Sequence, residues 1–77
     1  ESIEQEIEAK ELSGYINTWL AGLKQEDRVL FVRRYWYGEE VRELAKKCGV
    51  SATQMTQRML RLRRKLKSFL EEKGVVL

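Results

Sequence analysis

The chain has 77 residues, of which 43% are apolar and 35% charged; this fits one small globular domain and excludes a chain disordered throughout. With no Pro and five Gly, the sequence has few residues for tight β-turns, so we predict an all-α fold of four or five helices. The net charge of +3 favours mild affinity for polyanions, while the absence of His and the single Cys argue against an enzyme, a metal centre or a bound cofactor.

The first segment, from Ser2 to about Leu23, places most of its apolar residues three or four positions apart, as on one face of a helix. Gly14 weakens the case for one unbroken helix, and Ser13 before it is a good N-cap residue. We therefore expect a helix boundary near Ser13. Residues 1–13 are interpreted as an acidic N-terminal helical segment or the end of a linker, and residues 14–77 as the domain proper.

A second helix is expected to begin near Lys24, where acidic residues follow at once and suit the positive end of the helix dipole, and to stop at Gly38. It holds four of the seven aromatic residues of the chain. One helix cannot turn all of its large apolar side chains inward, so we expect part of this surface to stay exposed and to dock another protein. The candidate contact residues are Phe31, Val32, Tyr35 and Trp36.

A short third helix is expected over about residues 40–47, and we interpret Cys48 as a small core residue of a protein from a reducing compartment. Gly49 can adopt the left-handed conformation that turns the chain, and Ser51 can cap a fourth helix from about Ala52 to Glu72. The apolar spacings converge only if the last two helices cross at Gly49. One core should then contain Leu20, Leu30, Phe31, Leu44, Ala45, Val50, Met55, Met59 and Leu62.

Two helices joined by a short turn with Gly, the second capped by Ser and rich in Gln, Thr and Arg, are typical of a helix-turn-helix. A plain helical hairpin can show the same pattern. In a helix-turn-helix the first turns of the second helix enter a DNA major groove, where Gln and Arg match the edges of adenine and guanine. The candidate base-reading residues there are Thr53, Gln54, Thr56 and Gln57.

The charge is divided unevenly along the chain. Residues 1–40 hold five basic and nine acidic residues, whereas residues 41–77 hold ten basic and three acidic ones. Six of these ten lie between Arg58 and Lys67, with no acidic residue among them. Such a cluster favours phosphate binding, although a solvated helix face has the same composition. The candidate phosphate-binding residues are Arg58, Arg63, Arg64 and Lys65.

No stretch is long and apolar enough to span a membrane and no signal peptide opens the chain, so we expect a soluble cytoplasmic protein with no membrane partner.

The run from Glu43 to Ser51, followed by Met55 and by basic residues from Arg58 to Lys65, resembles region 4 of the bacterial sigma-70 family of RNA polymerase sigma factors. The residues from Arg28 to Tyr35 look like the preceding helix of that family, and the resemblance covers about residues 16–70. It is nearest to extracytoplasmic-function and related small sigma factors.

The resemblance implies that residues 14–77 form a domain that recognises the −35 promoter element in double-stranded DNA. It also implies that the first two helices contact the flap of the polymerase β subunit, and it leaves room for an anti-sigma factor. Carried over by position, Arg58 matches a basic position near the DNA backbone. The positions that approach bases are matched by Thr56, Gln57, Leu60 and Arg61.

The sequence departs from the family pattern in the first turn of the fourth helix. Ala52, Thr53 and Gln54 replace a more usual acidic-Gly-Thr run, Met55 stands where Val is common, and Gln57 takes a position often filled by Ser. These departures bear on which promoter is read, not on the fold. No segment resembles the region that melts the −10 element, so we expect a fragment of a sigma factor or a chain that acts beside a separate subunit.

Two other functions remain open at this point. The DNA-binding domain of a response-regulator-type activator also has a helix-turn-helix, but its last helix is normally apolar on an outer face, whereas residues 61–65 here are mostly basic. A helical protein-interaction module with an acidic partner is the second alternative. The salt dependence of binding to sequence-unrelated DNA would separate it from a DNA-binding domain, because phosphate contacts give a steep slope.

Overall fold

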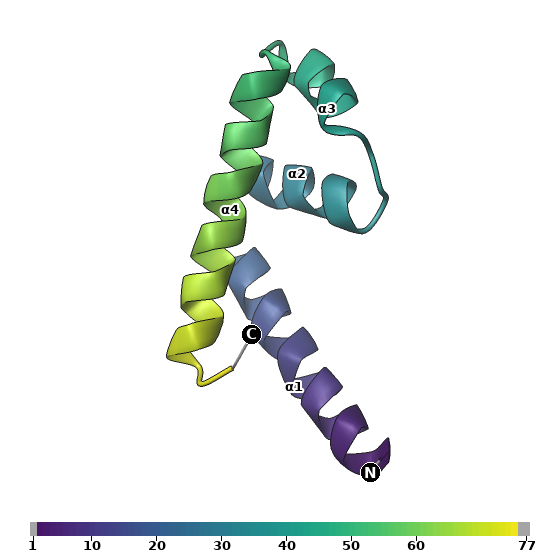
Figure 1. Cartoon of the computed structure of the whole chain (residues 1–77), viewed down its shortest axis with the longest axis vertical. Coiled ribbons are helices and arrows are strands. Elements are labelled where there is room, and N and C mark those ends of the chain that lie inside the picture. The colour runs from purple at the N-terminus through teal and green to yellow at the C-terminus, as the bar shows by residue number, and fades with distance from the viewer. Residues whose placement is uncertain (1, 76–77) are drawn as a thin grey trace.

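The computed structural model describes residues 2–75, with side chains from residue 9 onward, and this range contains four helices and no strand. The prediction of an all-α chain with four or five helices is therefore confirmed (Figure 1). No helix of the described range is long and apolar enough to cross a membrane. The helices are α1, Ser2–Ala21; α2, Gln25–Tyr35; α3, Val41–Cys48; and α4, Ala52–Glu72.

The longest helix, α4, is the spine of the molecule, and the other three pack against it (Figure 1). The short α3 lies at its N-terminal end, α2 lies beside its middle, and the last turns of α1 lie further towards its C-terminal end. The first half of α1, purple in Figure 1, extends away from the other helices. The molecule is therefore elongated, with extents of 45 × 22 × 20 Å.

One core joins all four helices, and it contains every residue expected there except Val50. Val50 is exposed because it lies in the turn between α3 and α4, where its backbone N–H bonds the Ala45 carbonyl and its side chain lines a shallow surface hollow. Trp19 joins the core from α1 and meets the ring of Phe31 edge-on, with centroids 5.0 Å apart. Phe31 also contacts the Tyr35 ring at 4.6 Å, so it is the centre of an aromatic cluster.

The turn between α3 and α4 has the geometry that its sequence predicts. Gly49 has a φ of +70°, where a Cβ atom would be strained, and its N–H caps the end of α3. Ser51 then starts α4 with a capping box: its Oγ accepts from the Gln54 N–H, and the Gln54 Oε1 accepts from the Ser51 N–H, each at 3.0 Å. These two devices fix where α4 begins and how closely α3 crosses it.

The expected helix boundary near Ser13 is wrong, since α1 runs unbroken from Ser2 to Ala21. A Gly inside a helix costs only about 0.5–1 kcal/mol, which packing of Ile16, Trp19 and Leu20 in the next turns offsets. The end of α2 also differs: the helix stops at Tyr35, and Gly38, with a φ of +67°, lies in the connection to α3.

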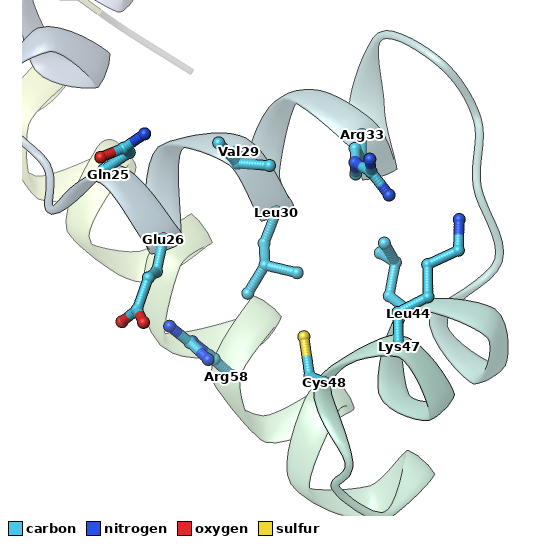
Figure 2. A pocket seen from close by; sticks show the side chains of 9 residues that line it. All are labelled: Gln25, Glu26, Val29, Leu30, Arg33, Leu44, Lys47, Cys48 and Arg58. Carbon is cyan, nitrogen blue, oxygen red and sulfur yellow. The ribbon is translucent and has the colours of Figure 1, made fainter.

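The expectation that Cys48 is a core residue is also wrong, because its side chain is exposed. Cys48 lies one turn after the buried Leu44, but its side chain lines the groove between α2 and α3 and not the core. Its sulfur faces an open groove between α2 and α3 of about 430 Å³ (Figure 2).

Candidate nucleic-acid interface

The side chains of α4 divide into an inward and an outward set. Met55, Met59 and Leu62 are almost completely buried and turn one face of the helix towards the core. The candidate DNA-contacting residues are exposed, with the exception of Arg58, which is half-buried. The exposed ones are Thr53, Gln54, Thr56, Gln57, Leu60, Arg61, Arg63, Arg64 and Lys65.

Five of these residues follow one another at short spacing on the side of α4 opposite the core, a set that we call the outward stripe. Spacings of three and four residues place side chains above one another on a helix of 3.6 residues per turn. The outward stripe covers about 16 Å of helix axis, at about 1.5 Å per residue. Its members are Thr53, Gln57, Leu60, Arg61 and Arg64.

Thr56 and Gln54 lie on opposite flanks of this stripe. Because the Oε1 of Gln54 accepts the Ser51 N–H, one of the two lone pairs of this oxygen is already used and the carboxamide is held at the start of α4. Gln57 has no such bond within the described part of the chain, so both its oxygen and its nitrogen point to solvent uncommitted. Of the two glutamines, Gln57 therefore has the fuller capacity for paired hydrogen bonds.

The cations of α4 are not equivalent. Arg61, Arg64 and Lys65 form no ion pair with another described residue. Arg63 donates from Nη1 to the Tyr35 hydroxyl at 2.6 Å, while both groups stay exposed. Arg58 donates from Nε and Nη2 to Oδ1 of Asp27, at 2.9 and 2.7 Å. Asp27 therefore competes with DNA phosphate for the Arg58 side chain, and the sequence analysis did not reveal this partner.

The aromatic end of α2 is only partly available for a partner. Phe31 is a core residue with 5% of its surface exposed, in contrast to the exposed position expected for a contact residue, because the cluster with Trp19 and Tyr35 buries it. Val32 is half-buried and packs against the core. Tyr35 and Trp36 are exposed, as expected. The neighbouring Tyr37 is exposed as well; the sequence analysis placed it inside the second helix and did not name it as a contact residue, whereas α2 ends at Tyr35.

Figure 2 shows the groove between α2 and α3, with Val29 and Leu30 on one side and Leu44 and Cys48 on the other. Arg33 and Lys47 lie at one end, and both pair with the Glu39 carboxylate, at 3.7 and 3.0 Å. Glu39 thus ties the connection between α2 and α3 to both helices. Among the side chains that the structure describes, those of residues 9–75, no group of three or more His, Cys, Asp or Glu residues could hold a metal ion.

Comparison with known protein families shows to which family the chain belongs. The family described as Sigma-70, region 4, matches residues 13–66. The chain belongs to this sigma-70 region 4 family. A comparison with curated proteins gives no match.

The match spans most of the sigma-70 region 4 fold seen here, from the second half of α1 to Leu66 in α4. It confirms the resemblance stated above and the helix-turn-helix made by α3 and α4. Region 4 is a DNA-binding domain without enzymatic activity, and it implies binding of a sigma factor to the −35 promoter element and to RNA polymerase in transcription initiation.

Proposed function

We propose that α4 reads the −35 element through its outward stripe, with Gln57 and Arg61 contacting base edges in the major groove. The main support is that Gln57 and Arg61 are both exposed and lie at helical spacing on one side of α4. Gln57 and Arg61 lie one turn apart on the side of α4 opposite the core, and no other described residue holds the Arg61 guanidinium in an ion pair. The rest of the domain lies behind the stripe and leaves it open to a duplex.

The stripe offers matching groups for adenine, guanine and thymine. The carboxamide of Gln57 can pair bidentately with adenine, and the Arg61 guanidinium can do so with guanine. Leu60, which is exposed despite being apolar, offers a contact to a thymine methyl group. Thr53, Thr56 and the NH₂ group of Gln54 complete the set of candidate base-reading groups.

Phosphate attraction is assigned mainly to Arg64 and Lys65, which lie further along α4 without an ion-pair partner in the described range. Arg63 can contribute while it keeps its bond to Tyr35, because both groups are exposed. These contacts hold the register of the helix on the duplex and carry no sequence information.

The experiment is promoter-directed transcription by the RNA polymerase holoenzyme on templates that differ at the −35 element. Gln57→Ala and Arg61→Ala should each reduce discrimination by about 1–3 kcal/mol, or roughly 5- to 150-fold. The matched control Arg64→Ala should weaken binding to correct and random DNA alike. Unchanged −35 discrimination in the Gln57→Ala, Arg61→Ala double variant would show that another surface reads the promoter.

Polymerase binding is assigned to the exposed aromatic surface formed by Tyr35, Trp36 and Tyr37 at the end of α2. Their exposed fractions of 41%, 57% and 75% are large for aromatic side chains in a domain with few exposed apolar residues. Aromatic residues are also enriched in protein interfaces. The partner is the flap of the polymerase β subunit, with an anti-sigma factor as a competitor for the same surface, and the site of action is the cytoplasm.

The acidic segment 1–13 lies outside the DNA-binding unit in this proposal, although residues 2–13 share the continuous helix α1 with the start of that unit. The family match begins at residue 13, and the first half of α1 extends away from the other helices (Figure 1). The DNA-binding unit is therefore taken as residues 14–77.

A further inference from the structure

Two arginines of α4 hold the two ends of α2. Arg58 donates two hydrogen bonds to Asp27 in the first turn of α2, and Arg63 donates one to Tyr35 in its last turn. Leu30 and Phe31 lie between these two anchors and are buried. Because Arg58 and Arg63 lie on opposite flanks of α4, α2 crosses the core face of α4 and is fastened on both sides.

The anchor at Asp27 has two hydrogen bonds between charged groups, whereas the anchor at Tyr35 has one. Among the ion pairs of the described residues, the pair of Arg58 with Asp27 alone joins α2 to α4, across 31 positions of sequence. Its side chains are 30% and 18% exposed, so the pair is partly withdrawn from water. Figure 2 shows the Arg58 side chain reaching from α4 towards the first turn of α2.

A phosphate would have to displace this partner. To reach DNA, the Arg58 guanidinium would give up two charge-assisted hydrogen bonds and leave the Asp27 carboxylate, mostly covered, without its cation. That carboxylate would then repel the phosphate that Arg58 had moved to meet. Lys65, seven residues further on the same flank of α4, is exposed and forms no ion pair with a described residue.

We propose that Arg58 is a positioning residue and not a phosphate-binding one. Its pair with Asp27 fixes the crossing of α2 over α4 and therefore the position of the aromatic surface relative to the outward stripe. The pair links the polymerase-binding side of the domain to its DNA-reading side. This inference rests on the proposed function, and the two can be tested separately.

The first test is the salt dependence of the chain's binding to sequence-unrelated duplex DNA. Removing one side chain that binds a phosphate should reduce the slope of log K against log salt by about 0.9. Lys65→Gln, the matched control, should show this reduction, whereas Arg58→Gln should leave the slope unchanged. If the slope of log K against log salt measured for Arg58→Gln were smaller by about one, the proposal would be overturned.

The second test is reversal of the pair. Asp27→Arg and Arg58→Asp should each lower the Tm by bringing like charges together, and the double variant should unfold at a higher temperature than either single variant. In the holoenzyme, at a temperature where circular dichroism shows every variant folded, the single variants should reduce promoter-directed transcription and the double variant should recover it. A double variant no better than the single ones in both measurements would refute the link.

These outcomes are distinct from a failure of the proposed function. If the unaltered chain showed no preference for a −35 element, the DNA-reading assignment would fall. The thermal unfolding of the reversed pair would still decide whether Arg58 and Asp27 hold α2 in place.

Discussion

Replacement of Ala45 by Leu tests the close crossing of α3 and α4. Ala45 is 2% exposed, and its carbonyl accepts the backbone N–H of Val50 at 3.0 Å, so neither its side chain nor its backbone can shift freely. The neighbouring core residues Leu44, Met55 and Met59 are at most 1% exposed and leave no space for the added isopropyl group. Overpacking of this kind costs about 1–3 kcal/mol.

For a domain of this size, each kcal/mol corresponds to a Tm change of roughly 4–8 °C. We therefore expect Ala45→Leu to lower the Tm by at least about 4 °C, measured by far-ultraviolet circular dichroism. The control is Lys46→Leu, which adds an apolar side chain at the next position of α3, where the side chain is 70% exposed. Lys46→Leu should change stability by less than about 0.5 kcal/mol. Equal Tm values for the two variants would refute the close crossing.

Two further predictions concern the start of α4 and the end of α2. Ser51→Ala removes the acceptor for the Gln54 N–H and should lower the free energy of unfolding, measured in urea, by about 0.5–2 kcal/mol. The control Ser68→Ala, at an exposed position inside α4, should leave it unchanged, and equal losses in the two variants would show that the cap is unimportant. Trp36→Glu should reduce the amount of the domain that the polymerase β subunit retains in a pull-down, with little change in Tm because the Trp36 side chain is 57% exposed. Full retention of this variant would exclude the aromatic surface as the contact.

The turn between α3 and α4 and the extent of α4 follow from the sequence because chemical signals mark them. Ser51 and Gln54 close a capping box, Gly49 takes a positive φ, and α4 begins and ends where its spacing predicts. Ser13 misled the interpretation because a Ser is also tolerated on an exposed helix face, which is where it lies in α1.

What the sequence could not predict is which element covers which face. Cys48 has the right spacing for a core residue, yet the groove beside it is open. Phe31 and Trp36 belong to one aromatic run, but only the packing of α1 and α4 decides that the first is buried and the second exposed. The partnership of Arg58 with Asp27 joins residues 31 positions apart and depends on how α2 crosses α4, so no local pattern announces it.

The interleaving of buried and exposed positions along α4 has a consequence for how new promoter preferences can arise. Met55, Met59 and Leu62 carry the packing, while the positions between them, Gln57 and Arg61, face solvent. A library randomised at the outward positions would therefore yield many folded variants, and under the proposed readout these would differ in DNA preference. Gln54 is the exception, because a change there also opens the capping box, so selection at this position would favour residues that can still close it.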